Sequence, residues 1–124
     1  MGKKIMVVDD SSVIRKLVVF TVGQSGYEAS EAGNGREALD RLSVDRPDLI
    51  ICDINMPVMD GISLLKTLKG DKAYSSHRFI PVLFLTTEPE GHIMEEAKKA
   101  GARAWMQKPF DPDRLIDTVS ILIG

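Results

Sequence analysis

Near the amino terminus the sequence reads Ile5-Met6-Val7-Val8-Asp9-Asp10, an unbroken apolar run that ends on two carboxylates. Its apolar part, Ile5 to Val8, is four residues long. Two further apolar runs have the same length, Leu49-Ile50-Ile51-Cys52 and Val82-Leu83-Phe84-Leu85. Apolar residues in succession, without alternation, are typical of strands covered on both faces, as in a parallel sheet flanked by helices. Weaker strand signals lie at residues 27–32 and 104–106. The sequence therefore predicts a parallel sheet of five strands.

Between these runs the apolar residues recur with the period of amphipathic helices, which predicts five helices in alternation with the strands. The predicted stripes are Ile14, Leu17, Val18 and Thr21; Gly35, Ala38, Leu39 and Leu42; Leu64, Leu65 and Leu68; Ile93, Met94, Ala97 and Ala100; and Leu115, Ile116, Val119, Leu122 and Ile123. Gly26 and Gly101 follow two of these stripes, as helix ends favour, and Asp111-Pro112 suits the start of the last helix. The alternation fills residues 1–124, so we expect one α/β domain and no separate output domain.

Composition narrows the classes of function. Sixteen Lys and Arg against 18 Asp and Glu give a net charge of −2, which argues against binding nucleic acid or anionic membranes through bulk charge. The only cysteine, Cys52, excludes an internal disulfide and fits a reducing compartment. The first apolar run is too short for a signal peptide, and no run approaches the roughly 20 residues of a membrane span. We therefore expect a cytoplasmic protein with no direct nucleic-acid partner and no membrane partner.

Functional groups are expected at the carboxyl ends of the strands, because ligands of open α/β sheets bind there. The polar residues that follow the predicted strands are Asp9, Asp10, Asp53, Asn55, Thr86, Thr87 and Lys108. These groups also have ordinary explanations. Asp9 or Asp10 would cap the following helix, and Asp53 would begin an Asx-type turn. Lys108 would be a solvated charge, and Trp105 a partly buried packing residue.

Taken together, the acidic residues predict a metal site. Three carboxylates at neighbouring strand ends repel one another unless a cation lies among them. An all-oxygen set suits Mg²⁺ and lacks the His and Cys ligands that zinc prefers. Because Mg²⁺ held in this way usually also binds a phosphate oxygen, the pattern points to phosphoryl transfer.

A carboxylate can be the nucleophile of phosphoryl transfer by forming an aspartyl phosphate. We expect Asp53 to be that nucleophile, with Asp9 and Asp10 holding the metal. Lys108 is expected to pair with Asp53 or with a phosphoryl oxygen, and Thr86 to donate to another phosphoryl oxygen.

Four motifs stand in order along the chain. They are Val7-Val8-Asp9-Asp10-Ser11, Asp53-Ile54-Asn55-Met56-Pro57-Val58-Met59-Asp60-Gly61, Leu85-Thr86-Thr87, and Gly101-Ala102-Arg103-Ala104-Trp105 with Lys108-Pro109-Phe110. Together they resemble the receiver domains of two-component response regulators, especially the single-domain chemotaxis type. Each motif is weak alone, but the four in this order are highly specific, and the resemblance covers essentially the whole chain. It implies a flavodoxin-like, doubly wound sheet of five parallel strands in the order 2-1-3-4-5, with five helices on both faces.

The resemblance implies a role for each site residue. Asp53 resembles the family's phosphoacceptor. The implied Mg²⁺ ligands are Asp10, Asp53 and the carbonyl oxygen of Asn55, with Asp9 helping through water. Lys108 resembles the family's site lysine, and its bond to Pro109 is expected to be cis.

The resemblance also implies a signalling cycle. A histidine kinase phosphohistidine, or more slowly acetyl phosphate, would transfer a phosphoryl group to Asp53, and the domain would catalyse only its own modification and hydrolysis. Thr86 would then move inward, and Trp105 would rotate into the space that it leaves. The surface of the fourth helix, fifth strand and fifth helix would change its affinity for a downstream protein. The residues expected on that surface are Met94, Lys98, Lys99 and Trp105, and the chain is expected to be a monomer or a weak dimer.

Two functions of other classes remain as alternatives. A Mg²⁺-dependent phosphatase of the haloacid dehalogenase type also uses an Asp nucleophile at a strand end, but it needs a second Asp where this chain has Asn55. A scaffold that lost phosphorylation would be expected to lack Asp53, Lys108 or the acidic pair, all of which are present. Flavin and dinucleotide binding are disfavoured, because Asp9-Asp10 repels phosphate and the sequence has no G-x-G-x-x-G motif.

Overall fold

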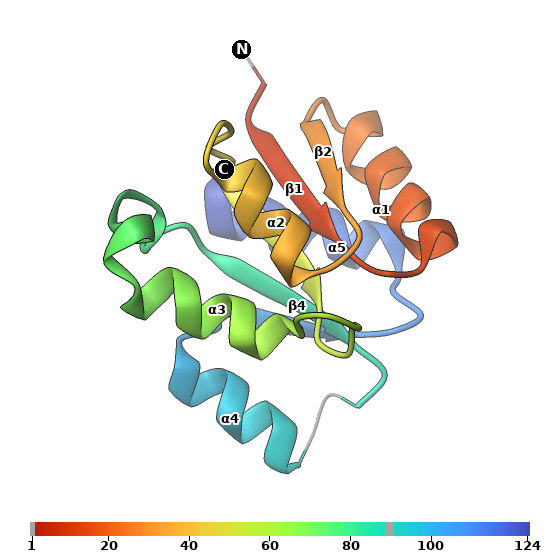
Figure 1. Cartoon of the computed structure of the whole chain (residues 1–124). Coiled ribbons are helices and arrows are strands. Elements are labelled where there is room, and N and C mark those ends of the chain that lie inside the picture. Colours follow the sequence, from red (N-terminus) through yellow and green to blue (C-terminus); the bar gives the residue numbers. More distant parts are fainter. Residues whose placement is uncertain (1, 89–90) are drawn as a thin grey trace.

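Five parallel strands form the central sheet in the order β2-β1-β3-β4-β5 (Figure 1). They are β1 (Lys4–Val8), β2 (Glu28–Ala32), β3 (Leu49–Asp53), β4 (Val82–Thr86) and β5 (Ala104–Gln107). The computed structural model describes residues 2–88 and 91–124. The register pairs Val8 with Cys52 and Cys52 with Phe84, so neighbouring strands end at nearly the same level. The sheet order that the family resemblance implied is confirmed.

In the described part of the chain, four α-helices connect successive strands, a fifth follows β5, and together they cover both faces of the sheet (Figure 1). They are α1 (Ser12–Gln24), α2 (Gly35–Leu42), α3 (Gly61–Gly70), α4 (His92–Ala100) and α5 (Pro112–Ile123). A short 3₁₀ helix, η1 (Lys72–His77), lies between α3 and β4. The apolar pattern did not predict η1, because that helix buries no residue. Among residues 2–88 and 91–124, no helix combines the length and apolar character needed to cross a membrane.

Two apolar clusters fill the space between the sheet and its helical layers. One cluster joins the strand residues Met6, Val8, Ile50 and Cys52 to α2, α3 and α4. The other joins Ile5, Val7, Leu49 and Ile51 to α1 and α5. Because both faces are buried, apolar side chains suit every position of β3 before Asp53, which explains the unbroken apolar run.

Two apolar side chains of the predicted stripes lie outside these clusters. Leu17 is 47% exposed and Ile93 is 38% exposed. On α1 the buried residues are Val18, Thr21 and Val22, which share one helix face. Since successive helical residues are about 100° apart, Leu17 lies at the margin of that face. The stripes predicted helices α1 and α4 correctly, but Leu17 and Ile93 are exposed rather than buried.

The single cysteine lies in the core of the sheet. Cys52 on β3 is buried, and its Sγ donates to the carbonyl oxygen of Asp53 at 3.1 Å. Burial raises the pKa of the thiol well above its usual value, and the charge of Asp53 adds to the rise. The prediction that Cys52 is a small core residue is confirmed.

Candidate functional site

Asp9 directly follows β1 and carries a buried carboxylate. Its side chain is 3% exposed, and its two oxygens accept from the Ser11 N–H at 2.9 Å and from Lys108 Nζ at 2.9 Å. The residue that caps α1 is Ser11, whose Oγ accepts the N–H of Ile14. The alternative in which Asp9 or Asp10 caps this helix is therefore wrong, because the Asp9 side chain is already bonded to Ser11 and to the lysine.

Lys108 bridges carboxylates from two different strands. Its Nζ lies 2.9 Å from Asp9 Oδ2 and 3.3 Å from Oδ1 of Asp53, the last residue of β3. The Lys108 and Asp53 side chains are only 13% and 12% exposed. The bond between Lys108 and Pro109 is cis, as the resemblance implied. The predicted pairing of Lys108 with Asp53 is confirmed, and the shorter contact with Asp9 adds to it.

Burial and neighbouring charges act on both members of this pair. Burial raises the pKa of Asp53, Lys108 opposes the rise without cancelling it, and Asp9 adds to it. Burial alone would lower the pKa of Lys108, but its bonds to the two carboxylates outweigh burial and raise that pKa above its usual value. One lysine therefore does not offset the combined effect of burial and neighbouring carboxylates on the pKa of Asp53.

Asp10 completes an acidic cluster with Asp9 and Asp53. One carboxylate oxygen of each residue lies within 4.8 Å of the others. Asp10 is exposed and Asp53 is partly exposed, so the cluster opens to solvent. Hard oxygen donors at this separation fit a single Mg²⁺, whose remaining positions go to water or phosphate oxygens. Asn55 lies exposed two residues after Asp53, and its carbonyl oxygen stays a predicted ligand.

Thr86 ends β4 beside the lysine. It is buried, and its carbonyl oxygen accepts the Lys108 N–H at 2.7 Å. Its Oγ1 accepts the N–H of Glu88 at 3.0 Å. The structure thus brings Thr86 to the edge where Asp53 and Lys108 meet, whereas the side chains of Thr87 and Glu88 are exposed.

Trp105 lies on β5, half-buried against α4. The Lys98 ammonium stands 5.0 Å from the centroid of its ring, a cation–π contact. The indole also borders a surface pocket of about 350 Å³ that Arg114 of α5 helps to line. Met94, which was expected on this surface with Lys98 and Lys99, is instead buried. Met94 lies on the face of α4 that packs on the sheet, so the expectation that Met94 belongs to the exposed surface was wrong.

Gly61 is the residue that lets the loop after β3 return to the site. Its N–H donates to the carbonyl oxygen of Ile54 at 2.8 Å. A Cβ at this position would stand 2.4 Å from the carbonyl oxygen of Asp53 and 2.8 Å from the Phe84 ring. Only glycine allows α3 to start this close to the end of β3, and the sequence motif alone did not reveal that reason.

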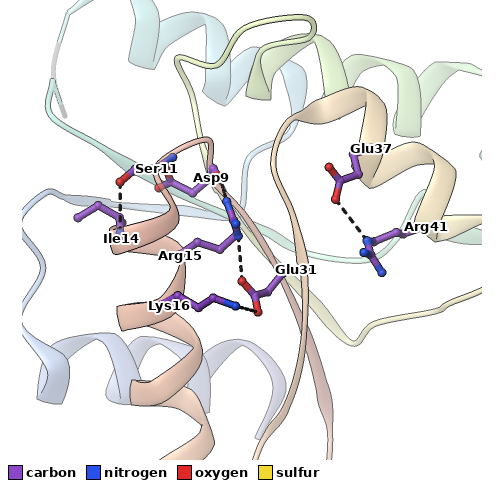
Figure 2. A network of polar contacts seen from close by, with 8 residues as sticks. All are labelled: Asp9, Ser11, Ile14, Arg15, Lys16, Glu31, Glu37 and Arg41. Carbon is purple, nitrogen blue, oxygen red and sulfur yellow. Dashed lines mark hydrogen bonds and ion pairs between the residues drawn. The ribbon is translucent and has the colours of Figure 1, made fainter.

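A network of charged residues behind Asp9 was not predicted (Figure 2). Arg15 on α1 donates from Nη1 to the carbonyl oxygen of Asp9 at 2.7 Å and from Nε to Glu31 at 2.9 Å. Lys16 donates to the other Glu31 oxygen at 2.9 Å. The bonds from Lys16 and Arg15 lower the pKa of Glu31, against the opposite effect of burial. The network depends on Glu31 lying beside Val7 in the sheet, a register that residue spacing does not show.

Comparison with known proteins agrees with this geometry. Residues 5–120 match the family described as response regulator receiver domain. The chain is 38% identical over 119 residues to sporulation initiation phosphotransferase F of Bacillus subtilis, which covers 96% of this chain and 92% of that protein. It is similar to the solved structure of chemotaxis protein CheY4 of Vibrio cholerae, with 40% identity and a TM-score of 0.89. This match covers 98% of this chain and 99% of that one. It is also similar to the receiver domain of a sensor histidine kinase from Pseudomonas aeruginosa, with 26% identity and a TM-score of 0.89. The match covers 100% of this chain and 99% of that one. That structure was solved with a magnesium ion coordinated in its active site cleft.

Proposed function

This chain belongs to the receiver domain family of two-component response regulators, and on that premise we propose that it is a phosphorylation-dependent switch whose phosphoacceptor is Asp53. The observation that carries the proposal is the contact of Lys108 with both Asp9 and Asp53 beside the acidic cluster. This arrangement offers a carboxylate nucleophile, oxygen donors for a cation, and one positive side chain for the phosphoryl oxygens. Those are the groups that transfer to an aspartate requires.

In the proposed transfer, a carboxylate oxygen of Asp53 attacks the phosphorus of a phosphohistidine. A P–O bond to Asp53 forms while the P–N bond to the imidazole breaks, and the imidazole nitrogen keeps the electron pair of that bond. Lys108 Nζ, 3.3 Å from Asp53 Oδ1, is placed to stabilise a phosphoryl oxygen. In hydrolysis, water attacks the phosphorus, the P–O bond to Asp53 breaks, and inorganic phosphate leaves. The domain would thereby catalyse only its own modification and its reversal.

The residues that would hold Mg²⁺ are Asp9, Asp10 and Asp53, with the carbonyl oxygen of Asn55 as a further donor. When bound, Mg²⁺ supplies positive charge to the phosphoryl oxygens. The separation of the three carboxylates supports this assignment, as does the magnesium ion in the similar Pseudomonas receiver domain. Asp9 would then contact two cations, Mg²⁺ and the Lys108 ammonium, because it also accepts from Lys108.

The proposed output device links Thr86 to Trp105. The Thr86 hydroxyl accepts from the Glu88 N–H, which leaves the hydroxyl proton for a phosphoryl oxygen on Asp53. In the register of β4 and β5, Trp105 lies beside Phe84. Phe84 precedes Thr86 by two residues on β4. An inward shift of Thr86 would open space for the half-buried indole. The surface of α4, β5 and α5 would then change its affinity for a downstream effector protein.

An exposed apolar stripe on α1 supports docking of the phosphodonor next to the site. Val13, Leu17 and Phe20 are exposed and recur at i, i+4 and i+7, so they share one helix face. The helix begins two residues after Asp10, so the stripe starts beside the acidic cluster. Grouped apolar side chains suit contact with a protein. We propose that a sensor histidine kinase contacts this stripe while its phosphohistidine reaches Asp53.

Phosphorylation of the Asp53→Asn variant by acetyl phosphate with Mg²⁺ tests the proposed function. We expect intact-mass spectrometry to detect one added phosphoryl group on the wild-type chain and none on the variant. Asp117→Asn, which removes an exposed carboxylate of α5, is the matched control and should be labelled normally. A phosphoryl group that is still added to Asp53→Asn would show that another residue is the acceptor. Steady turnover of an external phosphate ester would instead favour the phosphatase alternative.

A further inference from the structure

A group of three cations and one aromatic side chain lies at the end of the sheet opposite the carboxyl ends of the strands. It consists of Lys69 in the last turn of α3, Arg78 and Phe79 after η1, and Arg103 directly before β5. We refer to these four residues as the basal cluster. Figure 1 shows the end of α3 far from the carboxyl end of β4. The basal cluster is therefore separate from the Asp53 site.

Lys69 stands at the centre of the basal cluster. Its Nζ donates to the carbonyl oxygen of Arg78 at 2.6 Å. Its Cε lies 3.2 Å from the place that a Cβ on Gly101 would occupy, so its stem packs against the end of α4. Burial lowers the pKa of Lys69, and the charges of Arg103 and Arg78 lower it further. Lys69 thus contacts Arg78 and the turn at Gly101, two residues before Arg103, which places the three cations at the same end of the sheet.

No carboxylate balances these cations within residues 2–88 and 91–124. In those ranges no carboxylate oxygen lies within 4.0 Å of the charged nitrogens of Lys69, Arg78 or Arg103. Lys66, which precedes Lys69 by three residues on α3, contrasts with it by pairing with Glu96 at 3.8 Å. An anionic group bound at the basal cluster would relieve the repulsion there.

Phe79 gives the basal cluster an apolar member. The side chain is 78% exposed, and the Arg78 guanidinium stands 5.2 Å from its ring centroid. This cation–π contact orients the guanidinium before any ligand arrives. Aromatic and arginine side chains are enriched in protein interfaces and supply many of their energetically dominant contacts.

We propose that the basal cluster docks an acidic segment of a partner protein, with carboxylates on Lys69, Arg78 and Arg103 and an apolar side chain on Phe79. Charge complementarity supports the carboxylates, and the exposed ring supports a peptide, which offers apolar side chains beside its charges. The net charge of −2 disfavours a nucleic-acid polyanion. Because the basal cluster lies away from Asp53, this partner binds whatever the state of the phosphoacceptor. It can therefore hold the domain near a signalling complex while α4, β5 and α5 stay free for the effector.

An NMR titration of the full chain with two synthetic peptides tests this proposal. One peptide alternates Glu with Leu and Phe, and the other has Gln in place of every Glu. We expect the acidic peptide alone to shift the amide signals of residues 69–79 and 101–104 in a saturable way. The variant Arg78→Gln/Arg103→Gln should bind it about tenfold more weakly, and Phe79→Ala about threefold more weakly.

The matched control is Lys99→Gln/Arg114→Gln, which removes the same charge from exposed positions on α4 and α5. It should change the affinity by less than about twofold. An equal loss in the control would show non-specific attraction and overturn the proposal, as would tighter binding of an oligonucleotide than of the peptide. The affinity should also be unchanged when beryllofluoride is added with Mg²⁺. A change of about tenfold there would show coupling to Asp53 and overturn the separation of the two sites.

Discussion

Lys108 and Asp9 are 99 residues apart in the sequence, and their Nζ and Oδ2 atoms lie 2.9 Å apart in the structure. The two residues follow β5 and β1, and the sheet order places β3 and β4 between these strands. The lysine must therefore reach across the carboxyl ends of two strands, and Asp53 at the tip of β3 lies within its reach. The surroundings of the proposed phosphoacceptor are thus set by sheet topology rather than by local sequence.

Replacing Lys108 by Gln should destabilise the metal-free chain by about 2 kcal/mol, because Asp9 would keep a buried carboxylate without its cation. Urea unfolding at neutral pH measures the loss. Added Mg²⁺ should stabilise this variant more than it stabilises the wild-type chain, since the ion would replace the missing charge. Lys99→Gln, at an exposed position, is the control and should change stability by less than about 0.5 kcal/mol. Equal losses in the two variants would contradict a structural role for the Lys108 ion pair.

The raised pKa of Asp53 predicts a pH-dependent penalty to stability in the metal-free chain. Because the folded-state pKa lies above the unfolded value, ionisation of Asp53 favours unfolding. The penalty is fully present above the folded pKa and disappears as the pH falls below the unfolded pKa. Asp53→Asn should therefore be more stable than the wild-type chain at neutral pH and equally stable in acid. Thermal melts of both chains in a chelator, from neutral to acidic pH, measure the difference in stability. A stability difference in favour of Asp53→Asn that grew in acid would refute the prediction.

Gly61→Ala should cost about 3 kcal/mol, because the added methyl would stand 2.4 Å from the carbonyl oxygen of Asp53 and against the Phe84 ring. Both neighbours are parts of buried strands and have little room to shift. Gly70→Ala at the other end of the same helix is the matched control, since no atom outside the adjoining residues and the backbone of α3 lies within 4 Å of its Cβ position. We expect that control to be neutral or to stabilise the chain by roughly 0.5 kcal/mol. Urea denaturation of both variants makes the comparison, and similar losses would count against the close approach.

Arg15 and Lys16 both bind Glu31, but only Arg15 also binds the carbonyl oxygen of Asp9 (Figure 2). We therefore expect Arg15→Met to weaken Mg²⁺ binding by on the order of tenfold, because groups behind a ligand orient it. Lys16→Met should leave the affinity nearly unchanged. Titration of each variant with Mg²⁺ by calorimetry separates the two effects. If both variants lost affinity equally, charge near Glu31 rather than orientation of Asp9 would be responsible.

The emission of the sole tryptophan, Trp105, should respond to Mg²⁺ with beryllofluoride. The expected cause is movement of Thr86 and of the indole, which would alter the 5.0 Å contact between the ring and Lys98. Fluorescence spectra with and without the additives measure the response. Lys98→Gln should change the starting spectrum, because the cation near the ring is lost, and keep a response to the additives. A wild-type spectrum that does not change would argue against Trp105 as part of the switch.

Much of this fold follows from one-dimensional patterns. The three apolar runs lie in β1, β3 and β4 because strands covered on both faces require no alternation. Sequence reasoning also brought Asp9, Asp53 and Lys108 to one edge, because parallel strands present their carboxyl ends together. It could not show that Lys108 lies closer to Asp9 than to Asp53, since that depends on the positions of side chains.

The parts that sequence reasoning missed depend on register or on close packing. The bonds of Arg15 require Glu31 to lie beside β1, and the periodicity of each helix contains no such information. Ser11 caps α1 although two acids precede it, because the Asp9 carboxylate is bonded elsewhere. Leu17 has the spacing of a core residue, yet the helix is rotated so that its side chain meets solvent.

The burial of Cys52 has a practical consequence for experiments in solution. A chain whose single native thiol is enclosed, with its ionisation suppressed, offers almost no background reaction to maleimide dyes or nitroxide reagents. A cysteine introduced at an exposed position of α4 or α5 would be labelled selectively, without first replacing Cys52. Pairs of such labels would let pulsed resonance or energy-transfer distances compare the positions of these helices before and after phosphorylation.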